Sequence, residues 1–195
     1  MSNDALQRAC LDDCTEAQCE AIRHVDGPLL VLAGPGSGKT RVITRRIAHL
    51  AASGAPPSSL LAITFTNKAA GEMRDRVAAM GMAPGACLST FHSFCARILR
   101  RFAGEVGLTP SFSIYDTSDS LAAVKRILRE METDTTEVKP TRVLREISNA
   151  KNRLHTPEQV GASPLDHAET IAEAYTRYEK LLRASNAADF DDLLL

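Results

Sequence analysis

The sequence has no tryptophan, and aromatic residues make up only 5% of its 195 residues. It also has no excess of positive charge, with 23 Lys and Arg against 24 Asp and Glu. The chain as a whole therefore offers no strong field to a polyanion, and any nucleic-acid surface must be local. No apolar run approaches the length of a membrane span, and the first residues lack the order of a signal peptide. These absences predict a globular cytoplasmic protein without a membrane partner.

Cysteine occurs five times, and no two cysteines form a C-x-x-C pair. An odd number of scattered thiols is typical of the reduced cytosol. The loose spacing of Cys10, Cys14, Cys19 and His24 favours packed helical thiols over a zinc site. Apolar residues make up 44% of the chain, enough for the core of one large domain or two small ones.

Apolar runs and helical stripes alternate over the first 110 residues. The runs predict strands at 29–33, 60–65 and 87–89, and the stripes predict helices at 39–51, 68–80 and 91–102. This alternation predicts βαβ units and a parallel sheet, so the fold class is α/β. Upstream, Thr15 and Gln18 have the spacing of a helix-capping box, which predicts a short helix before the first strand.

The strand signal stops after about Pro110. Helical periodicity is found at 118–131, 140–151 and 165–182, between Pro, Thr and Asp punctuation. The sequence therefore predicts a separate, all-helical segment after the α/β part.

A phosphate-binding loop is the strongest motif. It is the stretch Ala33-Gly34-Pro35-Gly36-Ser37-Gly38-Lys39-Thr40, between a predicted strand and a predicted helix. Its glycines let successive N–H groups point at phosphates, and the helix N-terminus adds its positive end. Lys39 is expected to reach the β- and γ-phosphates, and the Thr40 hydroxyl to ligate Mg²⁺. The pattern normally begins with Gly, where this sequence has Ala33. A turn that only caps a helix would explain the glycines but not the Lys-Thr pair.

Three further segments resemble motifs of the superfamily 1 helicases of the UvrD, Rep and PcrA kind. Cys14 to Ala21 resembles the Q motif, although Cys14 stands where the family usually has a larger apolar residue. Ala62 to Ala70 is similar to motif Ia, and Ser89 to Cys95 is similar to motif Ib. With the phosphate loop, they identify the chain as a member of this family.

The resemblance implies an ATP-dependent DNA helicase that moves 3′ to 5′ in DNA repair or replication. It implies a RecA-like parallel sheet with helices on both faces. Lys39 and Thr40 would be the catalytic pair, with Thr40 as the metal ligand. The residues implied in binding ATP and Mg²⁺ are Gln18, Ala33, Gly34, Pro35, Gly36, Ser37, Gly38, Lys39, Thr40 and Arg41, of which Gln18 would read the adenine.

The resemblance also implies a path for single-stranded DNA along the strand ends. These positions supply hydroxyl, amide and ammonium groups for a phosphate backbone, and Phe65 for stacking on a base. The implied contacts are Thr64, Phe65, Thr66, Asn67, Lys68, Thr90, Phe91, His92 and Ser93.

The resemblance further implies the domain organisation. Residues 1–110 would be the N-terminal part of a RecA-like domain, 111–186 an inserted helical subdomain, and 187–195 the return segment. The partners would be single-stranded DNA, single-strand/duplex junctions and a second RecA-like domain beyond this chain. Candidate duplex contacts are Lys125, Arg126, Arg129, Lys139, Arg142 and Arg145, although solvated helix faces are the preferred interpretation for most of them.

Hydrolysis needs a further acidic element, an Asp-Glu pair at the end of a buried strand. The sequence contains no such pair. Asp191-Asp192 is a poor substitute, because its apolar run follows the acids instead of leading into them. We therefore expect the chain to end before the acidic element and to bind nucleotide without turning it over.

Three alternatives stay open on the sequence alone. One is a non-catalytic remnant of a helicase, and another is a RecB/AddA-like helicase–nuclease motor. The third is a small-molecule kinase, which would need neither Thr64 to Ala70 nor Thr90 to Ser93.

Overall fold

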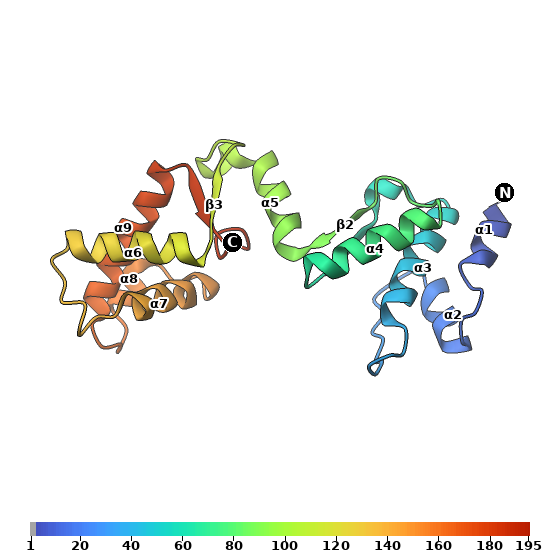
Figure 1. The fold of residues 1–195 in the computed structure, drawn as a ribbon, viewed down its shortest axis with the longest axis horizontal. Helices are drawn as coiled ribbons and strands as arrows, with labels where there is room; N and C mark the ends of the chain where they lie inside the picture. The colour runs from blue at the N-terminus through green and yellow to red at the C-terminus, as the bar shows by residue number, and fades with distance from the viewer. Residues whose placement is uncertain (1–2) are drawn as a thin grey trace. The chain divides into compact units, whose positions relative to one another are not determined.

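The computed structural model describes residues 3–195 as a mixed α/β protein, mostly helical, with two small parallel sheets (Figure 1). The chain divides into two compact units, Met1–Phe94 and Cys95–Leu195. Across residues 3–195, no helix is both long enough and apolar enough to cross a bilayer.

The first unit contains the short parallel sheet β1–β2 and four helices. Its elements are α1 (Asn3–Ala9), α2 (Glu16–Arg23), α3 (Lys39–Ala52), a 3₁₀ turn η1 (Pro57–Ser59), β1 (Leu61–Thr64), α4 (Asn67–Ala79) and β2 (Cys87–Thr90), and α5 (Phe91–Arg101) begins in it. The predicted strands at 60–65 and 87–89 and the helices at 39–51, 68–80 and 91–102 are confirmed, with ends that differ by one residue, as is usual. The sequence did not predict α1.

The α3 and α4 helices cover one face of the β1–β2 sheet. Ile47 of α3, Met73 of α4 and Leu88 of β2 share one buried cluster with Ala62 of β1. Alternate residues of a strand point to opposite faces, so Leu61 and Ile63 lie on the other face. Their exposed fractions are 46% and 37%, which leaves that face of β1 partly open.

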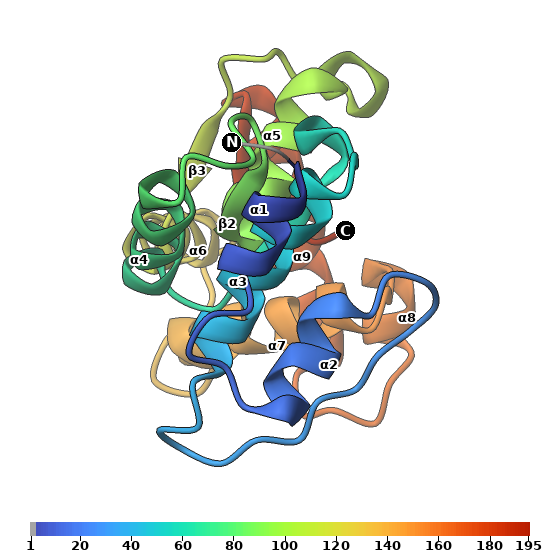
Figure 2. The ribbon, with the colours of Figure 1, turned by 90° about the vertical axis from the view of Figure 1, so that its right-hand side faces the viewer.

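The strand predicted at 29–33 is wrong. The segment between α2 and α3 is an irregular coil without an arrow in Figure 2, and Leu30 and Leu32 are 83% and 87% exposed. The physical reason is the lack of a neighbour, because within residues 3–195 strands pair only as β1–β2 and β3–β4. A strand is stabilised by ladder hydrogen bonds and cross-strand side-chain pairs, and an apolar sequence alone supplies neither.

The second unit packs four helices around a buried core. Its elements after α5 are η2 (Ala103–Val106), β3 (Ser113–Tyr115), α6 (Thr117–Glu130), α7 (Pro140–Asn152), α8 (Pro157–Gly161), α9 (Ala168–Ala184) and β4 (Ala187–Asp189). Val124 of α6, Ile147 of α7 and Ile171 of α9 are at most 2% exposed and face one another in this core. The three long helices predicted from periodicity are confirmed; the five-residue α8 was not predicted.

The prediction that residues 111–186 are all-helical is wrong, because β3 lies inside this range. β3 pairs in parallel with β4, with Ser113 opposite Ala187 and Tyr115 opposite Asp189. Three-residue strands are too short to show a period of two in the sequence. The pair brings together the points where the chain enters and leaves the helices α6 to α9 (Figure 1).

Candidate functional site

The glycine-rich loop turns sharply into the first residue of α3. Gly36 and Gly38 have φ of +76° and +84°, in the left-handed region that favours glycine, and Gly38 is the N-cap of α3. Lys39 folds back over the loop, and its Nζ donates to the carbonyls of Ala33 at 3.0 Å and Gly34 at 2.7 Å. The Ser37 hydroxyl donates to the Gly34 carbonyl at 2.7 Å, which tightens the same turn. Ala33, Gly34 and Pro35 are exposed.

The start of α3 fits an anion. No described side chain caps Gly38, and the first turn of α3 contains no acidic residue. Its first N–H groups and the helix dipole therefore face outward with positive character. Arg41 adds a buried guanidinium Nε that has no hydrogen-bond partner among the described residues. These donors, with the Lys39 ammonium, suit a triphosphate chemically.

Thr40 is the second residue of α3 and is half-buried. Its hydroxyl is a hard oxygen ligand of the type that Mg²⁺ accepts, with phosphate oxygens and water completing such a sphere. Within residues 3–195, no group of three or more His, Cys, Asp or Glu side chains is placed to hold a metal ion. A Mg²⁺ at this loop would therefore depend on the phosphates together with Thr40.

Gln18 connects α2 to the loop. The predicted capping box is confirmed, because the Thr15 hydroxyl accepts from the Gln18 N–H and the Gln18 side-chain oxygen Oε1 accepts from the Thr15 N–H at 3.1 Å. The same oxygen accepts from Arg41 Nη2 at 3.1 Å, and Gln18 Nε2 donates to the Ser37 carbonyl at 2.9 Å. The structure thus brings together Gln18, Ser37 and Arg41, three of the predicted nucleotide residues.

A hollow of about 350 Å³ adjoins the loop. Ser37, Lys39 and Arg46 are its polar lining residues, and the other lining residues are apolar. The lining residues are Ala21, Leu29, Val31, Ala33, Ser37, Lys39, Val42, Ile43 and Arg46. Its mix of an ammonium and apolar walls suits a ligand with an anionic end and a flat apolar part.

The second group of predicted residues meets at the carboxyl ends of β1 and β2. The parallel register places Thr64 opposite Thr90, so the residues that follow both strands lie at one sheet edge. Phe65 is 100% exposed and Phe91 is 54% exposed at this edge. Two aromatic rings are therefore open to solvent where the sequence predicted a base-stacking surface.

Helix starts support the polar residues of this edge. The Thr66 hydroxyl caps α4 by accepting from the Ala69 N–H at 3.1 Å, and Asn67 and Lys68 are the exposed first residues of α4. Thr90 is 7% exposed, and its hydroxyl donates to the Ser93 hydroxyl at 2.8 Å. His92 and Ser93 are exposed in the first turn of α5. Thr90 is thus held inside, whereas its neighbours remain accessible.

The acidic residues near the C-terminus have a different environment from the one that the sequence suggested. The short strand β4 leads into Asp191 and Asp192, which corrects the inference from the sequence that no strand comes before these acids. Asp192 Oδ1 accepts from Lys151 Nζ at 2.6 Å, and Asp191 Oδ1 accepts from Asn152 Nδ2 at 2.9 Å. Both carboxylates are thus engaged by side chains of α7. Sequence reasoning missed Lys151, since a lone lysine in an amphipathic helix gives no signal of burial.

Comparison with protein families matches residues 14–195 to the family described as UvrD/REP helicase N-terminal domain. Among curated proteins, the chain is 47% identical over 184 residues to ATP-dependent DNA helicase PcrA of Leuconostoc citreum, covering 91% of this chain and 24% of that protein. It is 45% identical over 197 residues to ATP-dependent DNA helicase PcrA of Bacillus subtilis, covering 97% of this chain and 26% of that protein. The chain therefore spans about a quarter of the length of these relatives.

Proposed function

The chain belongs to the UvrD/REP helicase N-terminal domain family, and on that premise we propose that it is the ATP- and single-strand-binding part of a 3′ to 5′ DNA helicase. In this proposal residues 1–110 belong to a RecA-like domain whose sheet has helices on both faces. Residues 111–186 are its inserted subdomain, and residues 187–195 return toward the RecA-like domain. A second RecA-like domain would complete the motor, which would act in DNA repair or replication.

The observation that carries the nucleotide site is the uncapped start of α3 beside Lys39. Binding of a triphosphate would let Lys39 exchange the Ala33 and Gly34 carbonyls for phosphate oxygens, since its Nζ is already directed at the loop. The α3 N–H groups would hold the same phosphates, and Gln18 would keep the loop against α2 or turn its amide to the adenine. Mg²⁺, held by Thr40, would supply charge neutralisation on the phosphates.

The exposed aromatic edge supports the DNA site. Phe65 and Phe91 would stack on unpaired bases, and Thr64, Thr66, Asn67 and Lys68 would contact the phosphate backbone. Thr90 would act indirectly by orienting Ser93, with His92 beside it. Because these contacts need separated bases, the preferred partner is single-stranded DNA, alone or at a junction with duplex.

We propose binding without turnover for this chain by itself. Within residues 3–195, the acids that directly follow a strand are Asp116 after β3, which caps α6, and Asp191 and Asp192 after β4, which accept from Asn152 and Lys151. They are therefore not available to orient an attacking water at the loop. Steady ATP hydrolysis by the purified chain that disappears in Lys39→Met would contradict this part of the proposal.

The binding test is calorimetric titration of the 195-residue chain with ATP and Mg²⁺. Lys39→Met should weaken binding roughly 10- to 100-fold, since a charge-assisted hydrogen bond contributes about 1.5–3 kcal/mol. Lys125→Met, which removes an exposed lysine of α6, is the matched control and should bind normally. Equal affinity in the two variants would refute the role of Lys39.

The DNA test uses a fluorescent oligo-dT and the variant Phe65→Ala. Stacking contributes about 1–3 kcal/mol per base, so affinity should fall at least about fivefold while stability is unchanged, because the ring is fully exposed. Phe102→Ala, which removes a ring that is 51% exposed in the other unit, should have no effect. Unchanged DNA affinity in Phe65→Ala would remove the stacking surface from the proposal.

A further inference from the structure

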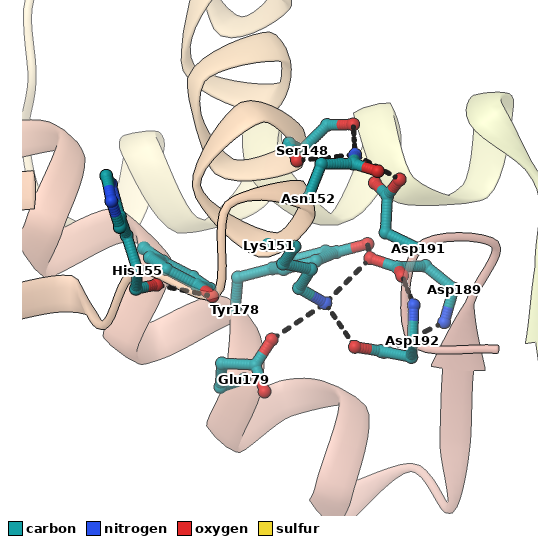
Figure 3. Close-up of polar contacts among 10 residues, drawn as sticks. Ser148, Lys151, Asn152, His155, Tyr178, Glu179, Asp189, Asp191 and Asp192 are labelled. Carbon is teal, nitrogen blue, oxygen red and sulfur yellow. Dashed lines mark hydrogen bonds and ion pairs between the residues drawn. The ribbon is translucent and has the colours of Figure 1, made fainter. Parts of the chain in front are cut away.

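A buried lysine lies in the second unit, outside every residue assigned to nucleotide or DNA. Lys151 of α7 has a side chain that is 1% exposed, and its Nζ is surrounded by three carboxylates (Figure 3). The distances from Nζ are 2.6 Å to Asp192 Oδ1, 2.8 Å to Glu179 Oε1 and 2.9 Å to Asp189 Oδ2. Burial alone would lower the pKa of Lys151, but Asp192, Asp189 and Glu179 outweigh it and raise that pKa. The lysine is therefore charged at neutral pH.

Two of the three carboxylates belong to one turn, residues 189–192. The Asp189 N–H donates to Asp192 Oδ2 at 3.0 Å, and the Asp192 N–H donates to Asp189 Oδ1 at 2.8 Å. Each carboxylate thus uses one oxygen for the turn and the other for Lys151. The lysine stabilises the shape of the turn as well as its attachment.

Neighbouring side chains hold the same turn to two helices. Tyr178 of α9 donates its hydroxyl to Asp189 Oδ2 at 3.1 Å, and Asn152 of α7 donates to Asp191 Oδ1 at 2.9 Å (Figure 3). Glu179 of α9 lies near Nζ as an ion pair without a directed hydrogen bond, which makes it the weakest of the three partners. The turn is therefore fixed to α7 and α9 together.

Asp189 is also the last residue of β4, opposite Tyr115 of β3. The cluster thus joins the helices α6 to α9 to the strand pair by which the chain enters and leaves them. We infer that Lys151 is a positioning residue: it locks β4 and the following turn onto α7 and α9, so that helices and strand pair form one rigid body. If the chain is part of a DNA motor, this rigid attachment would let the helices α6 to α9 contact DNA without bending where they join the strand pair. That consequence depends on the proposed function, whereas the inference itself does not.

The test is hydrogen exchange of the 195-residue chain carrying Lys151→Met. Removing one partner of a buried ion cluster leaves uncompensated charges, so protection of the Asp189 and Asp192 amides should fall about 100-fold or more. The amides of Val124 and Ile171, in the core of the same unit, should keep most of their protection. If Lys151 only added to global stability, its replacement would lower the protection of all four amides by the same factor. That result, or unchanged protection of the Asp189 and Asp192 amides, would overturn the inference.

Two further variants keep the test decisive. Arg142→Met removes another cation of α7, which contacts the exposed carboxylate of Asp166 at 3.6 Å, and it should leave the turn protected. If Lys151→Met does not fold, Asp192→Asn removes the closest partner and should give the same local pattern with a smaller factor. ATP and oligo-dT affinity, measured in parallel, report on residues of the first unit, so failure of the proposed function would be recognised separately.

Discussion

Replacing Gly38 by alanine tests how tightly the phosphate loop is built. Gly38 has φ of +84°, where an L-residue costs about 1–2 kcal/mol, partly offset by about 0.4–1 kcal/mol from the less flexible unfolded chain. An added Cβ would also lie 3.1 Å from Gln18 Nε2. The Gln18 amide would have to withdraw from the Ser37 carbonyl, a bond that contributes about 0.5–1.5 kcal/mol.

Gly54→Ala is the matched control. Gly54 has φ of +100°, and a Cβ there would meet no atom of the described residues within 4 Å, so it shares the backbone cost without the contact. Urea denaturation should show Gly38→Ala less stable than Gly54→Ala by about the hydrogen-bond contribution of 0.5–1.5 kcal/mol. Calorimetry should show weaker ATP binding only for Gly38→Ala. If both variants bind ATP equally well, the Gln18 contact does not organise the loop, and the reasoning fails.

Two further predictions concern stability. Burial, with Arg23 and Arg46 nearby, lowers the pKa of His49 in the folded chain, so the unfolded chain binds more protons. Stability that is present above about pH 6.5 is therefore lost as pH falls. Replacing the histidine in His49→Gln should make the urea midpoint depend less on pH between pH 7 and 5, whereas the control His155→Gln should not change this dependence. Ile147 is 1% exposed in the α6–α9 core, so Ile147→Ala should lower the free energy of unfolding by about 2–5 kcal/mol, as measured by urea denaturation. Ile98 is 43% exposed, so Ile98→Ala should lower it far less. Equal losses in the two variants would contradict the assigned core.

Local signals were sufficient for the long helices and for the glycine turn into α3, although they missed the short helices α1 and α8. The helices α6, α7 and α9 each bury one stripe, and a 3.6-residue period is visible in the sequence without any knowledge of partners. The Thr15–Gln18 capping box is equally local and is present in the structure. The three-residue spacing within that box and the Lys-Thr pair after the glycines could therefore be read directly.

Contacts between distant segments could not be predicted in this way. Ser113 and Ala187 pair in neighbouring strands although neither segment carries a strand pattern. Lys151 looks like a solvated lysine in a helix, and only the fold brings Asp189 and Asp192 to it. The use of the Gln18 amide was similarly hidden, because its bonds to Ser37 and Arg41 depend on how α2 packs on α3.

The segment Leu29 to Ala33 has the apolar pattern of a buried strand but does not form one, because no neighbouring strand pairs with it within residues 3–195. Its apolar side chains suit a strand covered on both faces, yet Leu30 and Leu32 are almost fully exposed. In a parallel sheet this segment would fix the first residue of the phosphate loop, since the loop begins at Ala33 where the strand would end. Within residues 3–195 this segment pairs with no strand, and the contacts that hold the loop come from Gln18 and the start of α3. Ordering that segment on binding would cost conformational entropy, so ATP should bind this chain more weakly than a loop whose strand is already paired.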